Sequence, residues 1–249
     1  LKLIKFLWSN DFDGGIITAS NSADGYPVSN LKHRWHTLHW RSINAANEYI
    51  RINLEEAKPI KGLAIKYHNF QVGDTVKIQA YNDAWLDLDY EDTLTITPEK
   101  IIRLWDTAKI YQWWQILMET APAAPATYHQ IGRLFLGNTS GLSKTFSAQH
   151  SYNLIDPSGI EYSGGGQVSS NPKPKYKQMG YTFKGLTAED KKTLEEIFEN
   201  VGVGGDYFFC ENVNELLFFY VRNISSWEIV DMKTSEKRYS LTIDMETLR

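Results

Sequence analysis

The stretch YPVSNLKHRWHTLHWRS, residues 26–42, carries the side chains best suited to recognising a ligand. It holds two tryptophans, three histidines and three basic residues, and it has neither a helical nor a strand period. A saccharide site needs a flat aromatic ring against the pyranose face and polar groups that fix the hydroxyls. Trp35, His36 and His39 are therefore candidates, with packing under the loop or against a neighbouring subunit as the alternative. Trp40 is expected in the core, because aromatic residues dominate small β-sandwich cores.

Zinc binding is not predicted for this stretch. His33, His36 and His39 lie three residues apart, and three imidazoles can bind zinc. That spacing brings the rings together only on a helix, and no cysteine or acidic residue lies between them. The metal would also be surrounded by like charge, from Lys32, Arg34 and Arg41. We predict no metal and no cofactor.

The segment NDAWLDLDYED, residues 82–92, gathers five carboxylates: Asp83, Asp87, Asp89, Glu91 and Asp92. Calcium takes about six to eight oxygen ligands, many of them carboxylates. The D-x-D-x-D-G calcium loop is missing from the segment, so a solvated acidic hairpin is expected.

The segment KYHNFQVGDT, residues 66–75, places His68 and Asn69 before a Gly-Asp turn. Asn and Gly favour turns, and a turn is the first expectation for this segment. Contact with a ligand or a partner at the same loop is the alternative, and on it His68 and Asn69 join the candidate carbohydrate site.

Catalysis is not predicted. The sequence has no G-x-S-x-G elbow, no H-E-x-x-H and no phosphate-binding loop. Cys210 lies between Phe209 and Glu211 in an expected strand, where a thiolate is disfavoured and a buried thiol is expected. Carboxylates are plentiful, but nothing in the sequence places two of them across a cleft, so a glycoside hydrolase fragment is unsupported.

The composition excludes two other classes of protein. The chain has 249 residues, one cysteine and a formal charge of -4, which gives no reason to expect nucleic acid binding. No apolar run approaches the roughly 20 residues of a membrane span, and the start LKLIKFLWSNDFDG is too soon acidic for a signal peptide. We expect a soluble protein without Sec-type export.

The first half must position these candidates on strands. Alternation of apolar and polar residues in 48–56 and 75–81 predicts strands with one solvent-exposed face. Further apolar runs are bounded by Gly, Pro, Asn or Asp, and no helical stripe lies between them. Several short strands without helices indicate an antiparallel β-sandwich, which we assign to residues 1–138, with the boundary in the small-residue stretch 137–143.

The second half, residues 139–249, is expected to be a β domain with one α-helix. Its glycine- and proline-rich opening excludes central strands. Thr187 is a good N-cap, apolar residues then repeat on one face, and Gly202 supplies a stop, so a helix is predicted over about 188–201. Apolar runs after the helix predict strands.

The order SNSADGYPVSNL, TLHWRS, EYIRINLEEAKPIKGLAI, TVKIQAYNDAW resembles discoidin-like, or galactose-binding-like, domains over about residues 8–137. Tyr49 stands where that family usually has Trp, and LEEAKPI replaces its usual Leu-Gly turn. The resemblance implies a jelly-roll β-sandwich with the stretch 26–42 among the loops at one end, and some such domains hold a structural calcium.

The run YHQIGRLFLGNTSGLSKTF, the following DPSGIEYSGGGQVSSNPKPKYKQMGYTF and the ending RYSLTIDMETLR look like bacteriophage virion proteins with a tail-tube or distal-tail fold. This resemblance implies a non-enzymatic component of the distal tail or baseplate. Its second domain would assemble into a homo-oligomeric ring with other tail proteins, and its first would face outward toward a host glycan. The location would be the virion, and the host cytoplasm during assembly. The alternative is a free carbohydrate-binding module of a cell-surface or secreted protein, whose second domain is a spacer.

Overall fold

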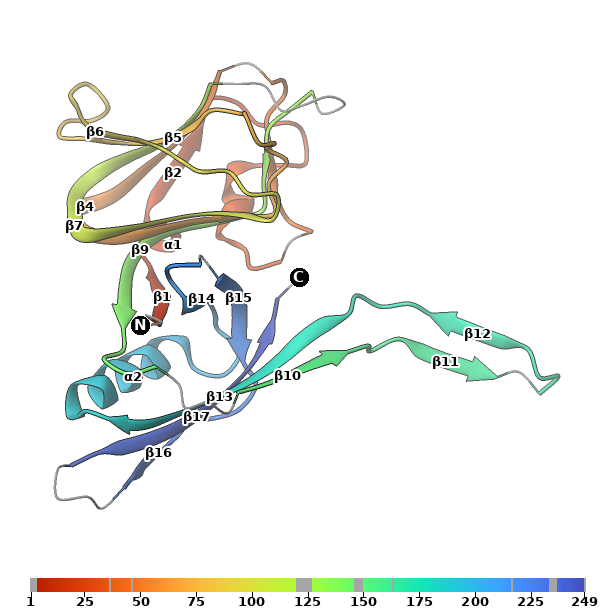
Figure 1. Ribbon diagram of the computed structural model, residues 1–249. Coiled ribbons are helices and arrows are strands. Elements are labelled where there is room, and N and C mark those ends of the chain that lie inside the picture. The colour runs from red at the N-terminus through yellow and green to blue at the C-terminus, as the bar shows by residue number, and fades with distance from the viewer. Residues whose placement is uncertain are drawn as a thin grey trace. The chain divides into compact units, whose positions relative to one another are not determined.

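The computed structural model describes residues 4–35, 37–45, 47–119, 127–145, 150–162, 164–215, 217–232 and 237–248. The described part of the chain is mainly β, with antiparallel strands and one long helix, which confirms the fold class predicted from the sequence (Figure 1). It divides into two compact units. Ser9–Thr139 is called the N-terminal unit, and Leu1–Trp8 together with Ser140–Arg249 is called the C-terminal unit. Each unit buries a hydrophobic core of its own.

The described residues of the N-terminal unit form a short helix α1 (Asp11–Gly14), a 3-10 turn η1 (Val28–Lys32) and eight strands. The strands are β2 (Ile16–Ala19), β3 (Trp40–Arg41), β4 (Glu48–Lys66), β5 (Val76–Tyr81), β6 (Leu88–Thr93), β7 (Lys100–Met118), β8 (Gln130–Ile131) and β9 (Arg133–Gly141). The order of hydrogen-bonded neighbours is β9-β4-β7-β5-β6, β2 pairs with β4, and β3 pairs with β8. All of these pairs are antiparallel.

The strands β4 and β7 fold over one core because each is long and irregular. Their register shifts between Asn53 and Lys58, where Glu55 has a φ of 67°, a left-handed conformation that bends the strand. Ile52 lies before the bend and Leu63 after it, and both are fully buried in the same core. The two halves of these strands therefore cover opposite sides of that core.

Alternation sorts the side chains of the N-terminal unit as the sequence predicts. Ile50, Ile52 and Leu54 are buried, and Trp40 is also fully buried, as predicted. The Trp40 indole nitrogen donates to the carbonyl of Asn21 at 3.1 Å, which satisfies its polar atom inside the core. The other face of β4 carries Tyr49, Arg51 and Asn53.

The C-terminal unit has the strand order β10-β13-β17-β15-β14-β1, with β16 on β17 and a separate β11-β12 pair. Its strands are β1 (Lys5–Asn10), β10 (His150–Ile155), β11 (Gly159–Tyr162), β12 (Val168–Asn171), β13 (Tyr176–Leu186), β14 (Asp206–Asn212), β15 (Leu217–Asn223), β16 (Glu228–Asp231) and β17 (Tyr239–Thr247). Cys210 is buried in β14, as expected.

The helix α2 (Ala188–Val201) lies where the sequence predicts it. Thr187 accepts a hydrogen bond from the Asp190 backbone at 3.1 Å, and Asp190 accepts one from the Thr187 backbone at 2.9 Å, which completes a capping box. Leu194 and Ile197 are fully buried in the core of the C-terminal unit. The helix is therefore fixed by its cap and by its apolar face.

The division of the chain differs from the predicted 1–138 and 139–249 at the start of the chain. β1 pairs with β14, with Phe6 opposite Phe209, so residues 1–8 belong to the C-terminal unit. The division between Thr139 and Ser140 lies within the stretch 137–143, where the boundary is expected, and this stretch is strand as far as Gly141. The sequence could not show the pairing of β1, because the partner of β1 lies about two hundred residues away along the chain.

Candidate functional site

Three loop segments of the N-terminal unit are joined into one scaffold by backbone hydrogen bonds. The amide of Ala23 donates to the carbonyl of Arg41 at 2.8 Å, and the amide of Ser42 donates to the carbonyl of His129 at 2.9 Å. Arg41 also lies opposite Gln130 in the β3-β8 pair. The amide of Asn69 donates to the carbonyl of Gln130 at 3.3 Å. The described residues of 23–42, together with 67–74 and 127–131, therefore form one end of this unit.

A cation surrounded by aromatic rings lies on this scaffold. The guanidinium carbon of Arg41 is 3.6 Å from the ring centre of Tyr128 and 5.6 Å from that of Tyr26. Tyr26 in turn stacks on His39, with ring centres 4.7 Å apart and planes at 30°. All four residues are half-buried. We call Tyr26, Trp35, His39, Arg41 and Tyr128 the loop-end site.

Arg41 is held by these rings instead of by an acid. Its side chain makes no hydrogen bond or ion pair with any described residue, and its buried Nε has no partner among them. A cation over an aromatic face is stabilised by about 0.5 to 2 kcal/mol. The guanidinium thus keeps hydrogen-bond donors uncommitted next to flat rings, which is the combination that a saccharide needs.

The structure places the predicted residues of the stretch 26–42 as follows. Trp35 is 62% exposed, in a turn closed by a hydrogen bond from the Leu38 amide to its carbonyl at 3.0 Å. His39 presents its ring to Tyr26 and accepts a hydrogen bond at its backbone carbonyl from Asn30 at 3.0 Å. His36 lies outside the described residues, so its role stays a prediction.

Asn69 braces the scaffold instead of facing solvent. Its side-chain nitrogen donates to the carbonyl of Tyr128 at 2.7 Å, and its side-chain oxygen accepts from the amide of Gln130 at 2.8 Å. Both ends of the amide are thereby used on one neighbouring loop. Asn69 therefore fixes the backbone at Tyr128, and each end of its side-chain amide has a partner in that loop.

His68 is also directed inward. Its ring stacks on Phe70 with centres 5.2 Å apart, and both of its ring nitrogens are buried. Burial lowers the pKa of His68 to about 4, against the smaller opposing effects of the carbonyls of Thr97 and Lys100 and of the Asp74 carboxylate. His68 is therefore neutral near pH 7 and forms part of the packing beneath the loop end.

Sequence reasoning did not single out Tyr26, Arg41 and Tyr128. Tyr26 and Arg41 lie at the two ends of the stretch 26–42. Because Trp40 is expected in the core and side chains alternate along a strand, the sequence indicates that Arg41 points away from the core. Tyr128 could not have been found, because it reaches Arg41 only through the pairing of β3 with β8.

The acidic hairpin distributes its carboxylates among separate partners. Asp92 pairs with Arg103 at 2.7 Å, and Asp89 accepts a hydrogen bond from Tyr111. Among the described residues, no group of three or more His, Cys, Asp or Glu side chains is placed to hold a metal ion. Of the three histidines His33, His36 and His39, His36 lies outside the described residues.

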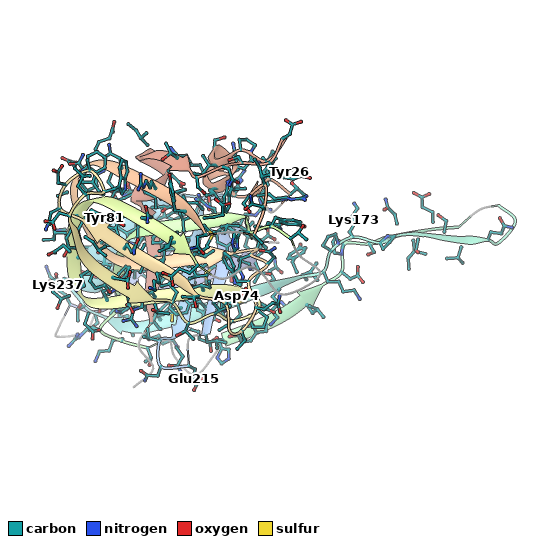
Figure 2. All side chains as sticks on the ribbon, turned by 90° about the horizontal axis from the view of Figure 1, so that it is seen from above. Tyr26, Asp74, Tyr81, Lys173, Glu215 and Lys237 are labelled. Carbon is teal, nitrogen blue, oxygen red and sulfur yellow. The ribbon has the colours of Figure 1, made fainter. Side chains whose placement is uncertain are left out.

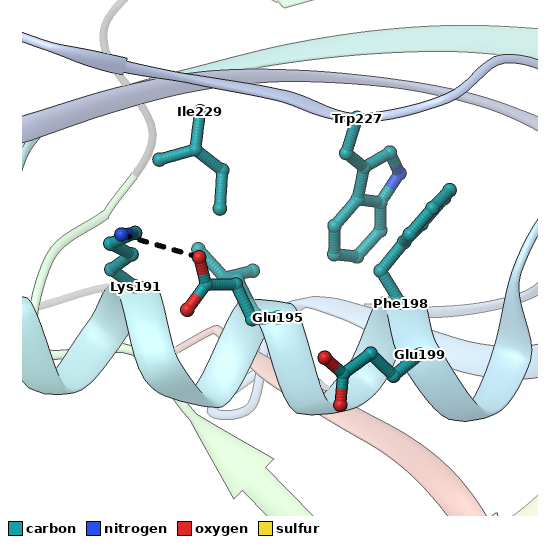
Figure 3. Close-up of a pocket in the computed structure, with 7 residues that line it drawn as sticks. Lys191, Glu195, Phe198, Glu199, Trp227 and Ile229 are labelled. Atoms are coloured by element: carbon teal, nitrogen blue, oxygen red, sulfur yellow. Dashed lines mark ion pairs between the residues drawn. The ribbon is translucent and has the colours of Figure 1, made fainter.

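A groove of about 390 Å³ lies beside α2 in the C-terminal unit (Figure 3). Phe198 and Trp227 form one side of it, with ring centres 5.2 Å apart, and Ile229 lies across from the helix. Lys191 and Glu195 form an ion pair at 3.3 Å along its rim. Both apolar and charged side chains line the groove, and its lining residues include no nucleophile with a base beside it.

No helix in the described part of the chain is long and apolar enough to cross a membrane.

Comparisons with known proteins give structural neighbours but no family. No family model matches the sequence, and no curated protein matches it. A Streptococcus pneumoniae fucose-binding module is 9% identical, with a TM-score of 0.43, over 52% of this chain and 94% of that one. The chitosan-binding module 1 of a chitosanase/glucanase from Paenibacillus sp. IK-5 is 16% identical, with a TM-score of 0.43, over 52% and 99%. The family 32 carbohydrate-binding module of C. perfringens NanJ, solved with galactose, is 16% identical, with a TM-score of 0.42, over 55% and 99%.

Proposed function

We propose that this chain is a non-catalytic saccharide-binding protein and that the N-terminal unit takes a sugar at the loop-end site. The observation that carries the proposal is Arg41, held between Tyr26 and Tyr128 without an acidic partner among the described residues. Its donors suit sugar hydroxyls, and the exposed indole of Trp35 offers a face for the pyranose ring. The site contains no pair of carboxylates for glycosidic cleavage among its described residues.

The proposal is tested by isothermal titration calorimetry of the full chain against galactose, fucose and glucosamine oligosaccharides. We expect binding of at least one of them in the wild type and a loss of about tenfold or more in Trp35→Ala and in Arg41→Gln, because a stacked ring or a charged hydrogen bond contributes about 1.5 to 3 kcal/mol. Thermal unfolding of each variant checks that the fold is retained.

Val72→Ala is the matched control, because Val72 is 80% exposed in the same group of loops and carries no polar group. It should bind like the wild type. The proposal would be contradicted if the wild type bound none of the saccharides. It would also be contradicted if Trp35→Ala and Arg41→Gln bound a saccharide as tightly as the wild type does.

A second function is proposed for the C-terminal unit, namely assembly with further copies of this chain. The β11-β12 hairpin extends away from the rest of this unit and pairs with no other described strand (Figure 1). It exposes Ile160 and Val168 by 62% and 61%. Because an isolated two-stranded hairpin is at most marginally stable in water, a neighbouring subunit would stabilise it.

Such assembly agrees with the ring implied by the resemblance to phage virion proteins. On this proposal the chain is a distal-tail or baseplate component, which assembles in the host cytoplasm and resides in the virion. A free module of a cell-surface or secreted protein, with the C-terminal unit as a spacer, is the alternative that needs only the loop-end site.

Light scattering coupled to size-exclusion chromatography distinguishes the two. We expect the wild type to form a closed oligomer at high concentration and the double variant Ile160→Asp, Val168→Asp to remain monomeric. Val203→Asp, at an exposed turn after α2, is the control and should still assemble. A wild type that stays monomeric at every concentration would support the spacer alternative.

A further inference from the structure

The outer face of the main sheet in the N-terminal unit carries an ordered row of polar side chains. Arg51 on β4 lies opposite Gln115 on β7, which lies opposite Gln79 on β5. The flanking residues on each strand point into the core, so these three point outward. Gln115 and Gln79 are nevertheless only 6% exposed, because neighbouring side chains on this face cover them.

These side chains form a directional ladder of hydrogen bonds. Nε of Arg51 donates to Gln115 at 2.8 Å, Gln115 donates to Gln79 at 2.8 Å, and Gln79 donates to Glu91 at 2.6 Å. Each amide has one orientation that satisfies both of its neighbours, so the row is rigid. The ladder therefore fixes the position of Arg51 before any ligand arrives.

Aromatic rings enclose the head of Arg51. Its guanidinium carbon is 4.5 Å from the ring centre of Tyr49 and 5.0 Å from that of Trp85. Trp85 meets Trp113 edge-on, with ring centres 4.7 Å apart and planes at 68°. Trp113 and Arg51 are half-buried, and both remain accessible in part.

Trp85 is held over Arg51 in an unfavourable conformation. Its φ is 67°, which a bulky residue rarely adopts, and its buried indole nitrogen has no partner among the described residues. Backbone strain of this kind is retained where a site needs a side chain in one place. The loop 82–87 thus places Trp85 against Arg51 and Trp113 at a cost to its own geometry.

The charge of Arg51 is not neutralised locally. Its terminal nitrogens make no hydrogen bond or ion pair with the described residues, and the carboxylates at the far end of the ladder, Glu91 and Glu119, pair with Lys77 at 3.3 and 3.0 Å. The hydrogen bond from Gln79 lowers the pKa of Glu91, which keeps that pair ionised. A fixed guanidinium with its two outer donors uncommitted has the geometry for a bidentate carboxylate.

We propose that this outer face, which we call the sheet-face site (Tyr49, Arg51, Trp85, Trp113 and Gln115), binds an acidic saccharide. The carboxylate of the sugar pairs with Arg51, and the sugar ring packs against Trp113. The sheet-face site is separate from the loop-end site, since Tyr81, which neighbours Trp113 in the sheet, lies far from Tyr26 (Figure 2). The inference does not depend on the loop-end site being functional.

The test is calorimetry of the full chain with two acidic probes, trigalacturonate and sialyllactose, and their neutral counterparts, the trigalacturonate methyl ester and lactose. We expect at least one acidic probe to bind about tenfold or more tightly than its neutral counterpart at low salt, and Arg51→Gln to abolish the difference. Arg51→Gln is chosen because an amide at this position can still donate to Gln115 and preserve the ladder.

Arg41→Gln and Trp35→Ala are the controls, and both should retain the preference for the acidic probe. The inference is overturned if neither acidic probe binds better than its counterpart, if Arg51→Gln keeps the preference, or if Arg41→Gln removes it. A failure of the loop-end site would instead appear as lost binding of neutral saccharides in the wild type, which leaves the result for the acidic probes readable.

Discussion

The loop end and the sheet face of the N-terminal unit both hold an arginine among aromatic rings, and they hold it by different means. Arg41 rests between Tyr26 and Tyr128 without a side-chain hydrogen bond to any described residue. Arg51 is tied to Gln115 and lies near Tyr49 and Trp85. The position of Arg41 depends on loops that are held by the hydrogen bonds of Asn69, and the position of Arg51 depends on the register of β4 and β7. Changes that loosen the loops should therefore weaken binding at the loop-end site and leave binding at the sheet-face site unchanged.

Lowering the pH is expected to produce the largest difference between the two sites. Because the pKa of His68 falls from about 6.5 in the unfolded chain to about 4 in the folded one, the unfolded state binds the proton more readily. Stability is then fully present above pH 6.5 and decreases as pH falls, by about 3 kcal/mol at pH 4. Denaturant unfolding from pH 7 to pH 4 should show a shallower slope in His68→Gln than in the wild type.

The exposed His33 provides the control, since His33→Gln should keep the wild-type slope. As the pH falls, binding at the loop-end site should weaken before binding at the sheet-face site does. A His68→Gln variant with an unchanged slope would show that His68 is protonated without strain in the folded protein.

Loss of the Asn69 brace is expected to have the next largest effect. Asn69→Ala removes the hydrogen bonds to Tyr128 and Gln130, which should lower the free energy of unfolding by about 2 kcal/mol. Neutral saccharide binding should fall about tenfold, because Tyr128 is no longer fixed against Arg41, while the preference for acidic probes persists. Asn200→Ala on α2 is the matched control. Calorimetry of Asn69→Ala with neutral and acidic probes checks the prediction. A loss of acidic-probe binding equal to the loss of neutral saccharide binding would refute it.

The converse change breaks the ladder. Gln115→Leu keeps a side chain of similar volume but removes the hydrogen bonds that Gln115 makes with Arg51 and Gln79, at a cost of about 1 to 2 kcal/mol. Binding of the acidic probe should fall and binding of neutral saccharides should not. Gln178→Leu in the C-terminal unit serves as the control. If acidic binding is retained in Gln115→Leu, the ladder does not position Arg51.

The smallest effect on stability is expected at Trp35. Because its side chain is 62% exposed, Trp35→Ala should change the free energy of unfolding by no more than about 0.5 kcal/mol. Its effect on neutral saccharide binding should be large by comparison. A stability loss of several kcal/mol in denaturant unfolding would instead indicate that Trp35 packs under the loop, the alternative considered for it from the sequence.

The parts of the fold that rest on local patterns could be predicted from the sequence. The alternation of Ile50, Ile52 and Leu54 placed β4 correctly, and the Thr187 cap with its apolar stripe located α2. Each of these signals lies within one segment of the chain. The pairing of β1 with β14 joins distant segments and left no local trace.

The sites were only partly predictable for the same reason. Trp35 and His39 were visible as aromatic residues in an irregular stretch, but the partners of Arg41 come from two different loops. Arg51 and Gln115 looked like ordinary exposed strand positions, and only the register between β4 and β7 brings them together. The turn expected in the segment 66–75 is present at Gly73, where the amide of Asp74 donates to the carbonyl of Gln71. The bracing role of Asn69 depends on residues about sixty positions away.

The central claim is that the loop end of the N-terminal unit binds a saccharide. Amide NMR of the full chain, titrated with the neutral saccharide that binds best in calorimetry, tests it most directly. We predict saturable shifts concentrated in residues 26–42 and 127–131, and their loss in Arg41→Gln. Shifts confined to other parts of the chain, or no saturable shift with any saccharide, would contradict the claim.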